Sequence, residues 1–148
     1  MGSSSRPARL AGLWPRFASL VYESVLLFGV VFISAYLFVA LARDAQHGLL
    51  RLTFQVYLLA ICGAYFVFCW TRSGQTLAMK TWRLRLQTTA GARLAPGRAL
   101  LRYLLAIPSV GLGLGLLWAL VDPDRQFLHD RLAGTRIVKA EDAGRGPV

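Results

Sequence analysis

The sequence predicts an all-α membrane protein with two full transmembrane helices and a third apolar segment that is broken or re-entrant. A small β-hairpin and a C-terminal strand are expected on the cytoplasmic side. Hydrophobic residues make up 55% of the 148 residues and charged ones only 16%, which is too little polar surface for a soluble domain. Lys and Arg number 17 against 7 Asp and Glu, a bias that marks cytoplasmic loops and contact with anionic lipid headgroups in a membrane protein. No recognised nucleic-acid-binding motif accompanies this charge, so we expect no nucleic-acid partner.

Two apolar runs are long enough to cross the bilayer. Residues 17–42 would span about 39 Å as a helix, against about 30 Å for the hydrocarbon core, so this helix would tilt. Ala40-Leu41-Ala42 resembles a signal-peptide cleavage site. The run is nevertheless too long for a signal peptide and contains Glu23, so we expect it to be retained. Residues 52–70 contain no charge and have aromatic residues toward both ends, as in a membrane helix anchored at two interfaces.

The loop of residues 71–102 carries seven basic residues and no acidic one. The positive-inside rule therefore places this loop in the cytoplasm, together with the arginine-bearing N-terminus. Trp82, Leu84 and Leu86 alternate with polar residues and precede a glycine-containing turn, which predicts a strand entering a hairpin. Pro96 suits the first turn of the helix that follows.

The third apolar run, residues 103–121, allows two structures. Pro108 and the glycines that follow it predict either one kinked crossing or two short helices in a re-entrant hairpin. A single crossing would leave seven basic residues outside, two in the first connection and five in the tail, whereas a re-entrant segment leaves only two. The strand-like "TRIVK", residues 135–139, can pair with "WRLRL" only on the same side of the membrane. We therefore favour the re-entrant form and a cytoplasmic C-terminus.

The chain divides into one domain and two short ends. Residues 1–9 are expected to be disordered, residues 10–139 to form the membrane domain, and residues 140–148 to be a flexible tail. Cys62 and Cys69 lie in one apolar run without metal-ligand neighbours. We interpret them as small buried residues and expect no cofactor and no metal.

Glu23 is the first candidate functional residue. It lies about 10 Å into the first apolar run, where an ionisable side chain must face protein and find a partner. Arg16 is on the same helix face, but helical side chains lean toward the N-terminus, so we expect Arg16 to reach the headgroups instead. The partner of Glu23 should then come from the third segment or the tail, with Arg102, His129 and Arg131 as candidates in that order.

The segment after the third apolar run, from residue 122 to the C-terminus and called the tail from here on, contains a dense charge cluster within "DPDRQFLHDRLAGTRIV". Such a cluster is commonly a solvated surface turn. Here the charged residues follow the third apolar run directly, and His129 and Asp130 lie among Phe127, Leu128 and Leu132. We therefore expect this segment to dock against the membrane domain.

Several stretches of the sequence resemble one protein family. Arg16 followed by Glu23, "SGQTLAMKTWRLRLQT", "RALLRYLL" and above all "FLHDRLAGTRIV" are similar to the RDD family of small bacterial integral membrane proteins. That family is named for an arginine and two aspartates, and the resemblance implies Arg16, Glu23 and Asp130 in these places. Glu23 is one methylene longer than the family's aspartate. Within "GQTLAMK", Ala78 and Met79 stand where the family often has a glycine and a basic residue.

The resemblance implies a multi-pass protein of the bacterial inner membrane whose activity is largely undefined, with transport or ion exchange the usual suggestion. We expect a small transporter or cation/proton exchanger that acts as a homo-oligomer, because three crossings are too few for a pathway within one chain. Glu23 would bind the ion, and Asp130, His129 and Arg102 would tune it. The alternative is a non-catalytic accessory or scaffolding protein that binds anionic lipid or a partner protein. Ser109 could be drawn with His129 and Asp130 as a triad, but no nucleophile motif supports this and we expect no enzymatic activity.

Overall fold

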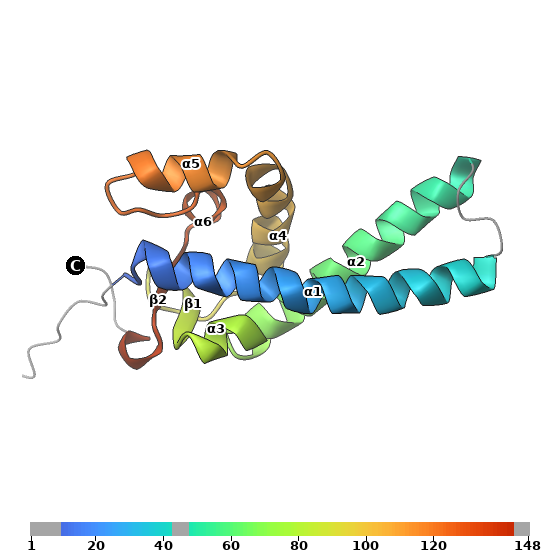
Figure 1. The fold of residues 1–148 in the computed structure, drawn as a ribbon. Coiled ribbons are helices and arrows are strands. Elements are labelled where there is room, and N and C mark those ends of the chain that lie inside the picture. Colours follow the sequence, from blue (N-terminus) through green and yellow to red (C-terminus); the bar gives the residue numbers. More distant parts are fainter. Residues whose placement is uncertain (1–9, 43–47, 144–148) are drawn as a thin grey trace, which may run out of the picture.

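A computed structural model describes residues 10–42 and 48–143. Two long helices, α1 (Leu13–Ala42) and α2 (Gly48–Arg72), pack side by side and run in opposite directions. The far end of this pair projects from a body built by the shorter elements (Figure 1). Both helices are long and apolar enough to cross a membrane, by length and composition. The predicted disordered segment, residues 1–9, lies outside the described residues, as does the end of the predicted tail.

Helix α1 is polar where it is buried and apolar where it is exposed. Its buried residues are Arg16, Ser19, Glu23 and Ser34, whereas Phe28 and other large apolar side chains on it are highly exposed. A helix of a soluble protein shows the opposite distribution. The pattern of α1 is the one expected of a helix whose outer surface meets lipid and whose polar residues face the protein interior.

The third apolar run is broken into two helices. Helix α4 (Pro96–Gly111) begins at a proline, as predicted, and continues through Pro108. It ends at a turn in which Gly113 has a φ of 70°, a left-handed conformation that favours glycine. Helix α5 (Leu114–Val121) then runs at a steep angle to α4 and back over the body (Figure 1). The prediction of a broken segment is confirmed. Of the residues that predicted it, Gly113 is at the break and Pro108 lies inside α4.

A two-stranded antiparallel sheet closes the end of the body where α1 begins. Strand β1 (Leu84–Thr88) pairs with β2 (Thr135–Lys139), and Leu86 lies opposite Ile137. Ahead of α1, Leu10 forms a further bridge to Val138. The pairing of "TRIVK" with the strand in the basic loop is therefore confirmed. The predicted hairpin is wrong, because β1 is followed by a turn and by α4, and its partner is β2 of the tail.

A short helix precedes each strand of the sheet. Helix α3 (Leu77–Thr81) packs against α1, and helix α6 (Leu128–Leu132) packs against α4 and α5. A 3-10 helix, η1 (Ala140–Asp142), follows β2. Leu84 and Leu86 of β1 enter a core with Trp70 of α2 and Tyr103 of α4. This core joins the sheet to α2 and α4.

Candidate functional site

A partly enclosed cavity of about 300 Å³ lies among α1, α2, α4 and the sheet. Helices α1 and α4 form its two sides, and each of them packs against α2. Most of its wall is apolar, but Arg16, Glu23, Arg102 and His129 all line it. The structure thus brings together four of the side chains that the sequence singled out. They come from α1, α4 and α6, which are far apart in the chain.

Glu23 faces this interior and is only 6% exposed. Its Oε1 accepts a hydrogen bond from the Tyr65 hydroxyl of α2 at 2.8 Å, and its Oε2 accepts one from the Thr76 hydroxyl. Thr76 also caps α3, since its Oγ accepts from the backbone N–H of Met79 at 3.2 Å. Among the described residues, no Lys, Arg or His nitrogen lies within 4 Å of the Glu23 carboxyl.

The expected partners of Glu23 are therefore wrong. We predicted a group from the third segment or the tail, whereas both observed partners are hydroxyls from α2 and from the turn that follows it. Arg102, His129 and Arg131 bond elsewhere. Tyr65 was interpreted only as one of the aromatic residues of its run. Thr76 carried a usable signal, because a threonine directly before a short apolar helix is a typical N-cap.

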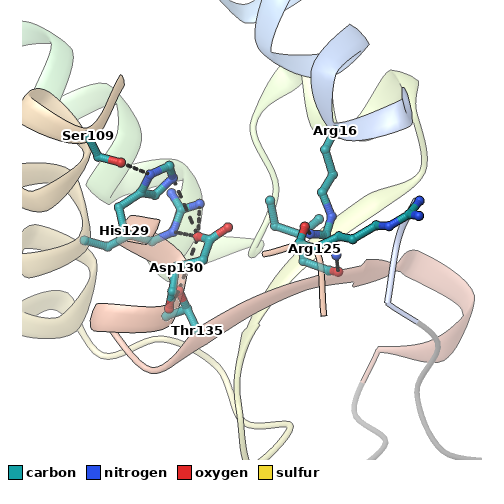
Figure 2. A network of polar contacts seen from close by, with 8 residues as sticks. Arg16, Ser109, Arg125, His129, Asp130 and Thr135 are labelled. Atoms are coloured by element: carbon teal, nitrogen blue, oxygen red, sulfur yellow. Dashed lines mark hydrogen bonds and ion pairs between the residues drawn. The ribbon is translucent and has the colours of Figure 1, made fainter. Parts of the chain in front are cut away.

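Arg16 also differs from expectation. Instead of reaching outward, it is 1% exposed, and its guanidinium donates to two backbone carbonyls of the tail. Nη1 lies 2.7 Å from the Arg125 oxygen, as Figure 2 shows, and Nη2 lies 3.3 Å from the Ile137 oxygen. The Ile137 oxygen also accepts from the backbone N–H of Ala11, which precedes α1, so the Arg16 side chain leans toward the start of its helix, as predicted. The tail folds over this end of the helix, and its carbonyls take the place that the headgroups were expected to have.

The second network joins α4 to α6 (Figure 2). Arg102 contacts Asp130 Oδ1 through Nε at 2.7 Å and Nη2 at 2.5 Å, and both side chains are buried. The guanidinium carbon of Arg102 also lies 4.2 Å from the centroid of the Trp70 ring, within the range of a cation–π contact. The Thr135 hydroxyl donates to the Asp130 carbonyl at 3.2 Å. The tail therefore docks against the body, as the interleaved charges suggested.

His129 links this network to the last turn of α4. Its Nδ1 lies 3.2 Å from Ser109 Oγ, and its Nε2 lies 3.8 Å from Asp130 Oδ1 (Figure 2). Burial lowers the pKa of His129 to about 4; Asp130 opposes this shift and Arg102 adds to it. The imidazole is therefore neutral near pH 7. Arg131, the remaining candidate, is half exposed and pairs with Asp122.

The Ser109–His129–Asp130 arrangement does not present a nucleophile. Ser109 is 5% exposed, and a Cβ on Gly115 would collide with its hydroxyl, so backbone closes over the oxygen that would attack. Asp130 Oδ1, which would orient the imidazole in a triad, is occupied by Arg102. This geometry suits a packing role. Among the described residues, no group of three or more His, Cys, Asp or Glu side chains could hold a metal ion.

The comparisons with known proteins identify the family of the chain. The model of the RDD family matches residues 10–134. This range begins at Leu10, ahead of α1, and ends just before β2. The chain belongs to the RDD family. An uncharacterized protein of Rickettsia prowazekii (strain Madrid E) is 29% identical to this RDD protein over 89 residues, which cover 60% of this chain and 50% of the relative. The chain thus spans about half the length of that curated relative, and no solved structure matches it.

Proposed function

We propose that this RDD protein is a multi-pass membrane protein that exchanges a small cation for a proton at Glu23. One observation carries the proposal: Glu23 is buried in the wall of a partly open cavity, with two hydroxyl partners and, among the described residues, no cation within 4 Å. A carboxyl that is permanently paired with an arginine stays ionised. One that is held by hydroxyls can alternate between a proton and a metal cation.

The partners of Glu23 suit either bound state. A hydroxyl can donate a hydrogen bond to the ionised carboxylate or turn its oxygen toward a neighbouring cation. Hard cations prefer oxygen ligands, and the carboxylate with the Tyr65 and Thr76 hydroxyls offers such a set. Asp130 and Arg102 neutralise each other close by and therefore contribute little net charge to the site. Arg16 lines the same cavity but lies about 10 Å from Glu23 along α1. These features support a site for a single positive charge beside Glu23.

We infer that α1 and α2 cross the membrane and that the sheet end faces the cytoplasm. The Lys and Arg count favours this orientation. The pairing of β1 with β2, and the bridge from Leu10 to Val138, support a common side for both ends of the domain. Since so few helices cannot enclose a complete pathway, the exchanger acts as a homo-oligomer.

Ion flux in reconstituted vesicles tests the exchange. Purified protein is placed in liposomes with a pH-sensitive dye inside, and sodium, potassium or lithium is added outside. We expect cation-driven proton movement with the native chain and none with Glu23→Gln. Glu141→Gln is the matched control, because it removes the same charge from an exposed residue of η1 that does not line this cavity. Equal flux from the native chain and Glu23→Gln would exclude Glu23 as the exchanging group.

The second candidate function is an accessory protein that binds anionic lipid or a partner protein. Its support is the set of exposed basic residues around the sheet end, which includes Lys80, Arg83, Arg93 and Lys139. Here Glu23 would be a structural group only. No flux from a folded protein, together with stabilisation by anionic lipid that is lost when these residues are neutralised, would favour this function over exchange.

A further inference from the structure

Arg16 places a positive charge in the cavity without a paired anion. The side chain is 1% exposed and lines the cavity, and both of its Nη atoms bond to neutral backbone carbonyls. Its Nε is buried and has no hydrogen-bond partner among the described residues. Asp130 and Asp122 attract the guanidinium through space, but no described carboxylate lies within 4 Å of it.

A buried cation without a paired anion lowers the stability of the fold. An arginine keeps its charge in proteins, and burying a charge is costly unless it is paired and fully hydrogen-bonded. Glu23 is not the missing anion, since its two oxygens bond to Tyr65 and Thr76. Arg102, the other arginine in the cavity wall, already has Asp130. Among the described arginines that line the cavity, Arg16 is therefore the one without a carboxylate within 4 Å.

From Arg16 the cavity continues between apolar walls. Leu20 and Leu27 line it on α1, and Ile107 and Val110 line it on α4. Leu27 lies three turns beyond Arg16, which is about 16 Å along the helix axis. The cavity volume of about 300 Å³ is at the lower end of the range for small-molecule sites. One charged end and one long apolar part together match an amphiphile.

We propose that this cavity binds an anionic amphiphile, a carboxylate or phosphate on a single hydrocarbon chain. The headgroup supplies the missing charge and accepts a hydrogen bond from the Arg16 guanidinium, which turns toward it on binding because its Nε is buried. The chain lies between α1 and α4. Both helices present apolar outer surfaces, so the chain enters from the lipid layer. The inference takes the membrane placement from the proposed function and does not depend on cation exchange.

Tryptophan quenching tests the proposal on the full chain in a neutral detergent. Dibromostearate is titrated, and its bromines quench Trp70, which lines the cavity; Trp70→Phe identifies that part of the signal. Oleate and oleyl phosphate should displace the probe. Mono-oleoyl glycerol, with the same chain and a neutral headgroup, should be about tenfold weaker, the value of one charge-assisted hydrogen bond. Inorganic phosphate, an anion without a chain, should not compete.

Two variants separate the headgroup from the chain. Arg16→Gln should weaken dibromostearate binding about tenfold or more, whereas Arg98→Gln, an exposed arginine of α4 outside the cavity, should leave it unchanged. If Arg16→Gln does not fold, Val110→Phe fills part of the apolar half without adding a tryptophan, and it should weaken binding to a similar degree while Arg16 keeps its carbonyl partners.

Three results would overturn the proposal. Equal displacement by oleate and by mono-oleoyl glycerol would show that the anion is irrelevant, and displacement by phosphate alone would show a site for a free anion. Unchanged binding in Val110→Phe would place the amphiphile elsewhere. The binding assay does not measure flux, so the two proposals can fail separately. If the native chain does not bind dibromostearate but shows Glu23-dependent flux, only the amphiphile proposal is refuted. Intact binding without flux refutes only the exchange.

Discussion

Arg102 of α4 makes both of its contacts with Asp130 of α6 through a single carboxylate oxygen. Nε and Nη2 of the arginine both reach Asp130 Oδ1, at 2.7 Å and 2.5 Å, while Oδ2 is buried with no hydrogen-bond partner among the described residues. The pair ties the tail to the helix that carries the third apolar run, with Trp70 of α2 against the guanidinium. Three segments of the chain therefore meet at one ion pair.

Asp130→Asn should destabilise the protein strongly. The change leaves Arg102 buried without a counter-charge, and breaking a buried ion pair in this way costs about 3–5 kcal/mol. Thermal unfolding in detergent measures the loss, with Asp124→Asn, an exposed aspartate of the same segment, as control. The double variant Arg102→Met with Asp130→Leu should lose less than the two single changes summed. Full additivity would show that the pair does not act as a unit.

Gly63→Ala should separate α4 from α2. A Cβ at this position would lie 2.9 Å from Tyr103 Cε1, and the ring is held because its hydroxyl donates to the Leu59 carbonyl at 2.8 Å. Overpacking of this kind costs about 1–3 kcal/mol. Gly29→Ala on α1 is the control, since nothing lies within 4 Å of its added Cβ and alanine favours a helix. Equal melting temperatures for the two variants would contradict the close packing at Gly63.

Thr76→Val should destabilise the fold by about 1–3 kcal/mol, because it removes a donor from buried Glu23 and the cap of α3 together. Thr76→Ser retains the hydroxyl and should behave like the native chain. Tyr65→Phe removes the other hydroxyl that donates to Glu23 but leaves the cap of α3 in place, so it should cost less, about 1 kcal/mol. The three melting temperatures in detergent check this order, and a Thr76→Val protein as stable as the native one would refute it.

Acidification should weaken the native chain through His129. The pKa of this residue is lowered to about 4 in the folded protein, against about 6.5 for an exposed histidine. Between these values the unfolded chain binds a proton that the folded chain does not. The free energy of unfolding therefore falls as the pH drops from about 6.5 toward about 4, by up to about 1.4 kcal/mol per pH unit.

His129→Gln keeps a polar group near Ser109 and removes the titration. Melting temperatures of both proteins between about pH 7.5 and about pH 5 measure the effect. The native chain should lose more stability over this range than the variant. Parallel losses in the two proteins would show that carboxylates, and not His129, cause the acid sensitivity.

The tail should lie on the same side of the membrane as the basic loop. Strand β1 of that loop pairs with β2 of the tail along five residues each, and a sheet cannot form across a bilayer. A reporter that is active only in the periplasm should be inactive when fused after Val148 and active when fused at Gly48, the first residue of α2. Activity at Val148 would contradict the proposed orientation.

The amino-acid sequence by itself determined the two long apolar helices, the break in the third apolar run, the strand "TRIVK" and the family. These features depend on local composition and on the order of short motifs, because an apolar run of sufficient length forms a helix in any membrane context. Alternating apolar residues likewise predicted β1 correctly. The same local pattern could not identify the partner of that strand, and the predicted hairpin was wrong for that reason.

Only the tertiary structure decided the partners of the buried charges. Glu23 meets Tyr65 and Thr76, which lie 42 and 53 residues further along the chain. Arg16 meets carbonyls of the tail, 109 and 121 residues away. Charge and hydrophobicity indicate that such buried groups need partners. They do not identify which residues the partners are. The choice depends on how α1 is rotated against α2 and on where the tail returns, which are set by the packing of the whole domain.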